Sequence, residues 1–415
     1  MIKKLLVCSA LLLFFNFGFS QSTQPDEPFL LASEDIFEKI DLLGNRYLEL
    51  GRFSGSILVE DGSTYYYNNF GKANYELDKG FDNTTAFKVG SLTELFTRAV
   101  FAELVRKEKI SADRMVSHYL PEVKKELTLR QLIDHRSELQ TIEEIKQAHP
   151  EAEYSAVSYA NLSKVAEFQK SDLNYNLLKN VLEVASDRTY AELISELAEK
   201  IQLKNTFFDT PVSTELAQGY TYSYEGNEVV VQPSEEYDTS ETFSSKSVKT
   251  TAADLLKLLK VFPEEELSME GYLKSDGFSY SVIKNGKRMI IVLSNRRHPV
   301  TGEITEAVNA LLDTGKCKLP LLRKEIKVDS RIIGEYAGSY ALNPDMHLGV
   351  MVENDSLFVQ MGPQKVHLKA QSPNQFYMEQ RDSAIRFLRG PSGEVIAAEL
   401  LDGFLTGKKI EKVNF

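Results

Sequence analysis

The first candidate for chemistry is a serine followed by a carboxylate, in the run Ser91-Leu92-Thr93-Glu94. The apolar spacing after it predicts a helix over residues 91–108, with the serine in its first turn. Residues at positions i and i+3 lie on the same face of a helix, so the hydroxyl and the carboxylate would share one side. A serine placed in this way is either a nucleophile, if a base takes its proton, or a structural cap.

The structural alternative is a capping box, in which a serine at the N-cap accepts a hydrogen bond from the backbone N–H three residues later. The glutamate at that third position then reaches back to the N–H of the serine. A carboxylate near a helix N-terminus is also stabilised by the helix dipole. We therefore expect Ser91 and Glu94 to form a capping box, and we expect Asp172 to cap the helix that begins there.

Patterns elsewhere predict the elements that would surround this serine. Helices are expected over residues 33–51, 172–186, 190–200, 254–261 and 302–312, and strands over residues 55–60, 65–70, 278–283 and 289–293. Strands lie at the two ends of this region and helices lie in the middle. This order predicts one antiparallel sheet assembled from both ends of the region.

The last part of the chain has a different character, with short alternating segments separated by turns. These segments cover residues 334–342, 347–353, 357–361, 366–370, 375–379, 385–388, 395–401 and 409–413. Asn354-Asp355 and residues 391–393 are strong turn signals. We predict a separate all-β domain over residues 327–415, folded as a barrel or a sandwich.

Composition excludes some partners and gives no sign of a cofactor. The chain has 415 residues and a formal net charge of -12, which argues against binding to nucleic acid or to anionic lipid. The six histidines show no metal-ligand spacing and no HExxH sequence is present, so no metal site is expected. We interpret His135 as a hydrogen-bonded structural residue rather than as a base.

Residues 1–20 have the pattern of a signal peptide, with two lysines, an apolar run over residues 5–17 and small residues at the end. The run is too short to span a bilayer comfortably. We expect cleavage after Ser20, a periplasmic or secreted mature chain, and no integral membrane segment after cleavage. Cys317 is then the only cysteine, and we expect it to be buried and inert.

Several separated segments together resemble the serine β-lactamase and penicillin-binding protein family, in its class C and esterase-like branch. The resemblance covers residues 52–295 and includes FSGSILVEDG, the helix opened by Ser91, LTLRQLIDHRSEL, NYNLLKNVLEVAS and MIIVLSN. The third of these segments resembles a stretch that ends in His-Thr-Ser-Gly-Leu in the family, and it keeps His135, Ser137 and Leu139. The resemblance implies an α+β fold over residues 33–320, in which helices flank an antiparallel sheet.

The resemblance also implies a set of catalytic positions, and each of them is altered here. Ser91 matches the nucleophile, but Glu94 stands where the family has the lysine that manages the serine proton. The second motif, Tyr-x-Asn, corresponds to Lys170-Ser171-Asp172. The third motif corresponds to residues 272–274, in an alignment that could slip by one, and it lacks both the leading cation and the glycine.

Three functions remain open. The first is an exported family member that has lost catalysis and binds a peptide, a glycan or cell-wall fragment, or a protein partner. The second is a weak hydrolase of esters or amides, with Ser91 as nucleophile and Lys170 as base, although a neighbouring Glu94 carboxylate would favour the ammonium form of that lysine. The third is an interaction protein that acts through its C-terminal β-domain. None of them requires a cofactor.

Overall fold

The computed structural model describes residues 35–141, 144, 171–208, 216–225, 228–234, 248–262, 265–273, 275–297, 300–343, 346–361, 364–378, 383–401 and 407–413. The expected signal peptide at residues 1–20 lies outside the described residues, and so do Lys170 and Lys274. The predictions made for them stay predictions.

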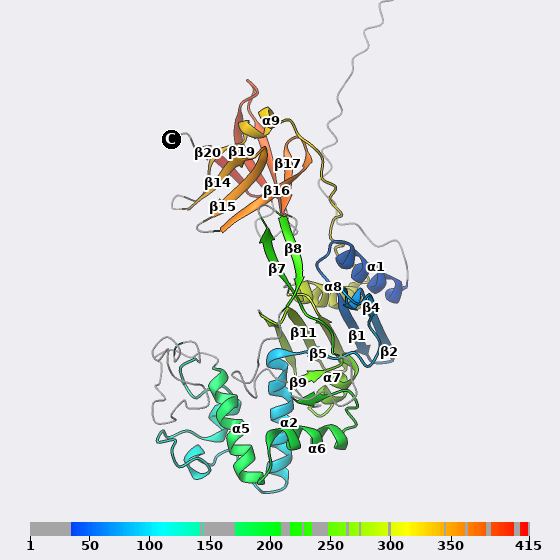
Figure 1. Cartoon of the computed structure of the whole chain (residues 1–415), viewed down its shortest axis with the longest axis vertical. Helices are drawn as coiled ribbons and strands as arrows, with labels where there is room; N and C mark the ends of the chain where they lie inside the picture. Colours follow the sequence, from blue (N-terminus) through cyan, green and yellow to red (C-terminus); the bar gives the residue numbers. More distant parts are fainter. Residues whose placement is uncertain are drawn as a thin grey trace, which may run out of the picture.

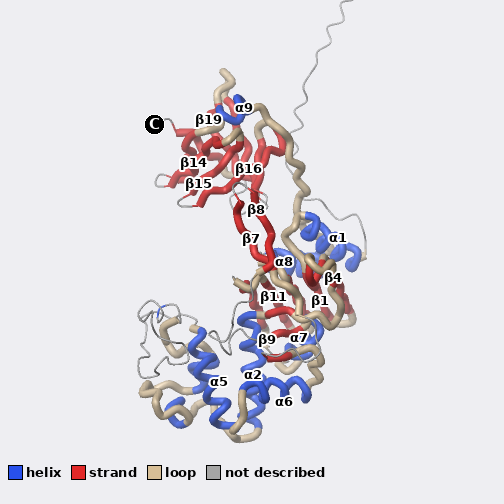
Figure 2. The backbone as a smooth tube through the Cα atoms, viewed as in Figure 1, coloured by secondary structure: helices blue, strands red, loops and turns tan. Residues whose placement is uncertain are grey.

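The helices of the described part fall mainly in its first three quarters. They are α1 Ile36–Glu49, the 3-10 turn η1 Gly90–Leu92, α2 Thr93–Arg106, the 3-10 turn η2 Val116–His118, α3 Leu129–Ile133, α5 Asp172–Ser186, α6 Tyr190–Lys200, α7 Ala252–Leu259, α8 Val300–Thr314 and α9 Ser330–Glu335. Figures 1 and 2 show α2, α5 and α6 together at one end of the molecule, with α1 and α8 beside the central sheet.

The central sheet has five antiparallel strands in the order β10-β11-β12-β1-β2. Its strands are β1 Gly55–Asp61, β2 Thr64–Phe70, β10 Leu267–Leu273, β11 Phe278–Asn285 and β12 Arg288–Ser294. Strand β1 pairs with β12, so that Gly55 lies opposite Ser294 and Asp61 lies opposite Arg288. This pairing confirms the prediction of one sheet built from both ends of the region.

The two faces of the sheet belong to two different cores. In β1, Ile57 and Val59 pack with α1 and α8, whereas Leu58 between them packs into the larger core that contains α2, α5, α6 and α7. This division follows from the strand geometry, because successive side chains point to opposite faces. Cys317 belongs to the core with α1 and α8, and its burial raises the pKa of its thiol to about 11. It is buried, as expected.

Short strands complete the region around the sheet. They are β3 Lys72–Asn74, β4 Lys79–Gly80, β5 Phe87–Lys88, β6 Phe207–Phe208, β7 Tyr220–Glu225, β8 Glu228–Pro233 and β9 Val248–Thr250. Strands β5, β9 and β6 form a small sheet, and β7 and β8 form a separate hairpin. Figure 1 shows this hairpin running from the central sheet toward the C-terminal barrel.

The C-terminal strands close into a barrel of consecutive antiparallel neighbours. They are β13 Gly338–Asn343, β14 Met346–Glu353, β15 Ser356–Met361, β16 Gln364–Ser372, β17 Gln375–Met378, β18 Ser383–Arg389, β19 Val395–Leu401 and β20 Lys409–Val413. Each predicted segment corresponds to one strand, and the barrel rather than the sandwich is confirmed. The start of the first segment was wrong, because residues 330–335 form α9, capped by Asp329 at its N-terminus.

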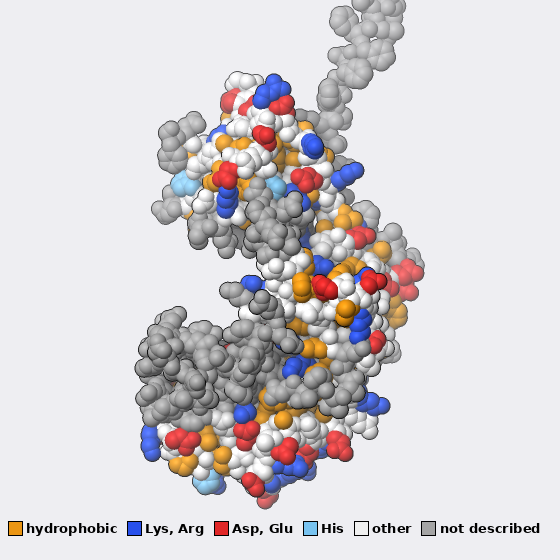
Figure 3. Space-filling model, viewed as in Figure 1, with side chains coloured by type: hydrophobic (Ala, Val, Ile, Leu, Met, Phe, Trp, Pro, Cys, Tyr) orange, Lys and Arg blue, Asp and Glu red, His pale blue; other side chains and the backbone are white. Residues whose placement is uncertain are grey.

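The barrel interior is filled by side chains. The rings of Tyr336 and Phe387 are stacked with centroids 4.2 Å apart, and Phe376 packs edge-on against both. On the drawn face, Figure 3 shows acidic and basic side chains interspersed over the barrel and over the helical end of the molecule. Among the described helices, none combines the length and the apolar character needed to cross a membrane.

The segment that leads into the barrel is attached at both ends. On the side of the sheet, Arg46 of α1 donates a hydrogen bond of 2.6 Å to the carbonyl of Pro320. On the side of the barrel, the N–H of Ile326 donates to the carbonyl of Ala370 at 2.9 Å. Arg323 also donates to Gln371 of β16 at 2.7 Å. These contacts tie the connecting segment to both parts.

Candidate functional site

Ser91 lies in the 3-10 turn that leads into α2, with a half-buried side chain. Gly90 before it has a φ of 53°, and a Cβ there would lie only 3.0 Å from the Tyr280 ring and 3.3 Å from Leu273. The turn is therefore seated directly on β10 and β11, at the edge of the central sheet. Within the described residues, no hydrogen bond engages the Ser91 hydroxyl.

The expected capping box is wrong. Helix α2 begins at Thr93 and has Leu92 at its N-cap, without a side-chain cap hydrogen bond. Because a 3-10 turn precedes the helix, Ser91 lies inside a continuous helical segment and does not occupy the N-cap. The position of Glu94 in the first turn of α2 was correct, but its carboxylate has a different partner.

Glu94 is held by His135. Its residue is only 4% exposed, and its Oε2 lies 3.2 Å from His135 Nε2. His135 comes from the loop after α3, where it has a φ of 53°. A buried carboxylate requires a hydrogen-bond donor, and this ring provides one. The side chain at the position of the family's lysine is thus fixed by a residue far away in the sequence.

The other ring nitrogen of His135 continues a chain of hydrogen bonds. Nδ1 lies 3.2 Å from Asn174 Nδ2, and the Ser137 hydroxyl donates to Asn174 Oδ1. The backbone N–H of Leu139 donates to Ser137 Oγ at 3.2 Å. Asn174 is fully buried on α5, and Ser137 is 1% exposed. Both polar side chains therefore depend on this chain for their hydrogen bonds.

In this chain of hydrogen bonds each side chain donates to the next, from Ser137 through Asn174 and His135 to Glu94. An amide nitrogen can only donate, so Asn174 Nδ2 donates to His135 Nδ1, and that nitrogen carries no proton. The proton of a neutral ring then resides on Nε2 and is donated to Glu94. In this assignment His135 is a satisfied structural residue, as interpreted from the sequence, and neither of its nitrogens is left to serve Ser91 as a base.

An aromatic residue closes the site beside the ring. Tyr175 packs against His135 with centroids 4.9 Å apart, and its hydroxyl donates to the carbonyl of Ile133 at 3.1 Å. Burial, together with the charge of Glu94, raises the pKa of the Tyr175 phenol far above its ordinary value. Tyr175 is therefore a neutral wall of the site at any physiological pH.

The helix that carries Asn174 and Tyr175 has the predicted start, but its N-cap residue differs from the prediction. Ser171, not Asp172, is the N-cap of α5, and its hydroxyl oxygen accepts from the N–H of Leu173. The same hydroxyl donates to the carbonyl of Gln140 at 2.7 Å. Ser171 is thus the middle residue of the altered second motif and has a structural role. Lys170, proposed as a base, lies outside the described residues.

Two cations near Ser91 in the sequence are already paired with carboxylates. Lys88 of β5 lies 2.5 Å from Asp276, and both side chains are largely buried. Arg98, one turn beyond Glu94 on α2, makes a two-pronged ion pair with Glu265 at 2.6 and 2.9 Å. Neither cation contacts the Ser91 hydroxyl.

The end of β10 is the expected location of the third motif, and the described part of that strand lies beside the serine. Leu273, its last residue, packs against Gly90. Tyr272 points away and is 56% exposed, with Arg297 5.7 Å from its ring centroid. Lys274 lies outside the described residues.

Sequence reasoning missed Asn174 and the Lys88–Asp276 pair. Asn174 had a detectable signal, because it occupies the same helical stripe as Leu177, Leu178 and Val181. A polar side chain on an apolar stripe requires a buried partner. The Lys88–Asp276 pair had no such signal, since the two residues are 188 positions apart.

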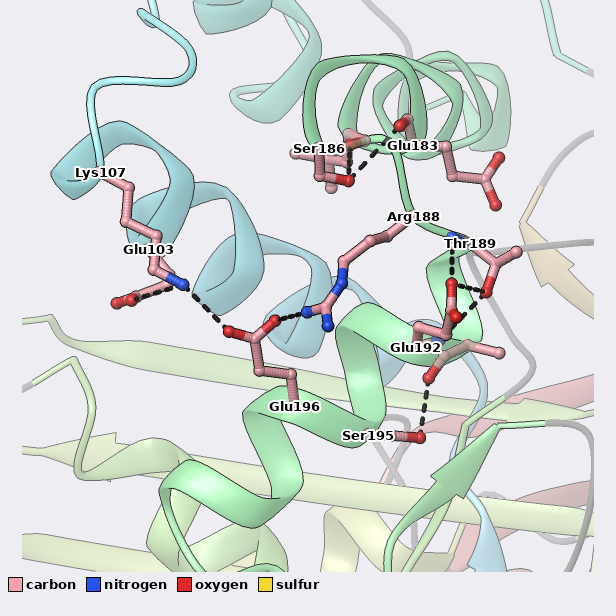
Figure 4. Close-up of polar contacts among 11 residues, drawn as sticks. Glu103, Lys107, Glu183, Ser186, Arg188, Thr189, Glu192, Ser195 and Glu196 are labelled. Atoms are coloured by element: carbon pink, nitrogen blue, oxygen red, sulfur yellow. Dashed lines mark hydrogen bonds and ion pairs between the residues drawn. The ribbon is translucent and has the colours of Figure 1, made fainter.

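A second candidate, a surface crevice between α2 and α6, carries no nucleophile. Its floor is formed by Val100, Leu104, Leu193 and Leu197, and its rim by Glu103, Lys107, Glu196 and Lys200. Figure 4 shows Lys107 and Arg188 both directed at Glu196. The charged rim residues are thus paired with one another, and the crevice is the packing interface between α2 and α6. In the described residues no three potential metal ligands come together.

Comparison with known proteins points to one family. The family model described as Beta-lactamase matches residues 54–277. Teichoic acid D-alanine hydrolase from Staphylococcus aureus is 29% identical over 206 residues, covering 47% of this chain and 50% of that protein. The chain thus spans about half the length of the curated relatives that it matches.

Solved structures agree on the fold. The octameric penicillin-binding protein homologue from Pyrococcus abyssi has a TM-score of 0.57 and 18% identity, with 90% of this chain and 99% of that chain covered. FmtA from Staphylococcus aureus has a TM-score of 0.57 and 19% identity, with 72% and 93% covered. A class C beta-lactamase has a TM-score of 0.56 and 17% identity, with 67% and 98% covered. The family match covers more than half of the sequence, and the chain belongs to the beta-lactamase family.

Proposed function

We propose that this protein is an exported member of the family that does not perform acyl transfer by the serine–lysine mechanism and that uses its site to bind a ligand. The observation that supports the proposal is the hydrogen bond of 3.2 Å from His135 to Glu94, at the position of the lysine. The hydrogen-bond chain behind His135 holds the carboxylate as an acceptor. The site thus has a stable structure that does not depend on catalysis.

The electrostatics of the reaction lead to the same conclusion. Acyl transfer by a serine develops negative charge on the carbonyl oxygen, which the active site must stabilise. Two unit charges about 4 Å apart interact by roughly 4 kcal/mol at an effective dielectric near 20. A carboxylate in place of an ammonium turns an attraction of this size to the developing oxyanion into a repulsion. Even a penalty of about 3 kcal/mol would slow the reaction more than a hundredfold.

A cell-wall fragment is the ligand class we favour over a peptide or a protein partner. The support is indirect and comes from the relatives, one of which is named for the removal of D-alanine from teichoic acid. A protein that keeps the architecture without the reaction would retain affinity for such a polymer without releasing its D-alanine. Binding of D-alanylated teichoic acid, compared with the same polymer after the alanyl esters are removed, tests this ligand class.

Covalent labelling tests the loss of catalysis. The full chain and Ser91→Ala are incubated with a fluorescent penicillin and with a fluorophosphonate, beside an active class C beta-lactamase as positive control. We expect no label on either chain. A label on the wild type that disappears in Ser91→Ala would contradict the proposal.

The second candidate is a weak hydrolase with Ser91 as nucleophile and Lys170 as base. It is favoured by one observation: the Ser91 side chain is half-buried at the start of α2 and makes no hydrogen bond within the described residues. Turnover of an activated ester by wild type, Ser91→Ala and Lys170→Met separates this candidate from the first. Equal background rates for all three chains would end it.

The third candidate, binding through the barrel, is limited by the packing of its interior. Tyr336, Phe376 and Phe387 fill the space between the strands, and each is at most 1% exposed. A ligand of the barrel would therefore bind to its outer surface. Surface substitutions on the barrel that abolish binding, while Ser91-site substitutions leave it intact, would favour this candidate.

A further inference from the structure

We infer that His135 is a proton-dependent switch: uptake of a second proton by its ring forces the Asn174 amide to invert, and the inversion reaches Ser137. The inference concerns the hydrogen-bond chain itself and does not depend on whether Ser91 can be acylated. It therefore goes beyond the proposed function and can fail separately from it.

The structure corresponds to the state with a neutral ring. Ser137 donates to Asn174 Oδ1, Asn174 Nδ2 donates to His135 Nδ1, and His135 Nε2 donates to Glu94. Each of these three side-chain donors has an acceptor. The Leu139 N–H completes the chain by donating to Ser137 Oγ.

A protonated ring requires the opposite orientation of the amide. Both ring nitrogens then donate, so Nδ1–H would face the Nδ2 hydrogens of Asn174. Rotation of the Asn174 amide by half a turn removes this conflict, because Oδ1 then accepts from Nδ1–H. After the rotation, Nδ2 donates to Ser137 Oγ, and the Ser137 hydroxyl hydrogen loses its acceptor.

A neutral ring with its proton on Nδ1 is not compatible with an ionised Glu94. Such a ring would turn a bare Nε2 lone pair toward the carboxylate, placing an acceptor against an acceptor. The two consistent states therefore differ by one proton on His135 and by the orientation of one amide. This coupling is what makes the chain a switch.

Charged and titratable groups surround the ring on each packed element. Glu94 of α2 and Tyr175 of α5 contact the ring, Arg98 and Asp134 act electrostatically on Tyr175, and Asp172 lies in the first turn of α5. Asp134 and Arg136 flank the ring in its own loop. Glu94 accepts from Nε2–H in both states, whereas the buried Ser137 hydroxyl has an acceptor only in the state with a neutral ring.

The switch would change the wall of the site as a unit. Glu94, His135 and Asn174 come from the first turn of α2, the loop after α3 and the first turn of α5, and α5 contacts both α2 and α3. A change of pH would alter which groups in this wall donate and which accept. Binding to the site would then depend on pH through His135.

Nitrogen NMR of the full chain labelled with ¹⁵N in histidine and asparagine tests the inference. The His135 signals are assigned by their absence from His135→Asn. At neutral pH we expect the proton on Nε2 and none on Nδ1. On acidification both nitrogens should become protonated, and the Asn174 side-chain amide signals should shift with the same midpoint.

Three variants make the test specific. Asn174→Asp offers two acceptors, so its ring should keep the second proton at pH values where the wild-type ring is neutral. Glu94→Gln keeps an oxygen acceptor for Nε2–H without the charge, so inversion of the Asn174 amide should still accompany protonation of the ring. Tyr175→Phe is the matched control, because it keeps the aromatic ring beside His135 and removes the hydroxyl that donates to Ile133; its midpoint should match the wild type.

Four results would overturn the inference. They are a neutral ring with its proton on Nδ1, an Asn174 amide whose signals stay constant while His135 titrates, a ring that takes up no second proton before the chain unfolds, and a Glu94→Gln variant in which the ring is protonated without any change of the Asn174 signals. If Asn174→Asp does not fold, Glu94→Gln and the wild-type spectra decide the matter.

Discussion

Removal of the Asn174 side chain should cost far more stability than an asparagine on a helix surface normally contributes. Asn174 is fully buried, and Asn174→Ala would remove both the acceptor of the Ser137 hydroxyl and the donor to His135 Nδ1. A buried polar group that loses its partner costs about 1–3 kcal/mol. Two such groups give an expected loss of about 2–6 kcal/mol in the free energy of unfolding.

Urea unfolding measures this loss. Circular dichroism is the suitable signal, because the sequence contains no tryptophan. Val184→Ala is the control on the same helix: Val184 is 55% exposed, and its substitution should cost less than about 1 kcal/mol. If Asn174→Ala costs no more than Val184→Ala, the hydrogen-bond chain does not stabilise the site, and the reasoning about Glu94 fails with it.

Three further outcomes follow from separate features. Gln202 has an exposed side chain and a φ of 57°, where a side chain costs about 1 kcal/mol, so Gln202→Gly should raise the melting temperature while Gln202→Ala should not. Hydrogen bonds from Arg106 and Lys200 lower the pKa of Glu103 to about 2. The ionised carboxylate should therefore stabilise the fold above its ordinary pKa, and this stabilisation should be lost as the pH falls toward 2. Acid titration of wild type and Glu103→Gln should show the loss in the wild type and not in the variant. Lys88→Met should destabilise the fold by about 3–5 kcal/mol in urea unfolding, because it leaves the buried Asp276 carboxylate without its cation, whereas Lys88→Met with Asp276→Leu should recover most of the loss.

The parts of the fold that could be predicted are those determined by local patterns. Helix α5 has the predicted bounds Asp172–Ser186, because its apolar stripe repeats at helical spacing and a polar cap precedes it. The barrel strands were predicted individually, because side chains that alternate between the interior and the solvent leave a period of two in the sequence. The first predicted barrel segment, residues 334–342, began too early, because residues 330–335 form the short helix α9 before the first strand.

The candidate site could be predicted only in part, because its decisive contacts are non-local. Ser91 and Glu94 have the spacing of a capping box, and nothing nearby in the sequence argues against it. The structure differs because His135, 41 positions away, takes the carboxylate. The partner of the ring, Asn174, is a further 39 positions along the chain. A motif therefore identifies the family but does not indicate what replaces a lost catalytic group.

The chain of hydrogen bonds also predicts that a lysine cannot simply be restored at position 94. A lysine ammonium only donates, so in Glu94→Lys it would face the donating Nε2–H of His135. The ring could present a bare Nε2 only with its proton on Nδ1, which requires the Asn174 amide to invert and leaves the buried Ser137 hydroxyl without an acceptor. We therefore expect Glu94→Lys to be destabilised and to remain unlabelled by penicillin.

Asn174→Asp should rescue part of that loss. An aspartate accepts from both Ser137 and the Nδ1–H of His135, and in the double variant Glu94→Lys, Asn174→Asp the free Nε2 can then accept from the introduced ammonium group. One recovered buried hydrogen bond corresponds to a favourable coupling of about 1–3 kcal/mol between the two substitutions. Urea unfolding of the wild type, the two single variants and the double variant measures the coupling. Strictly additive changes would mean that positions 94 and 174 do not communicate through His135.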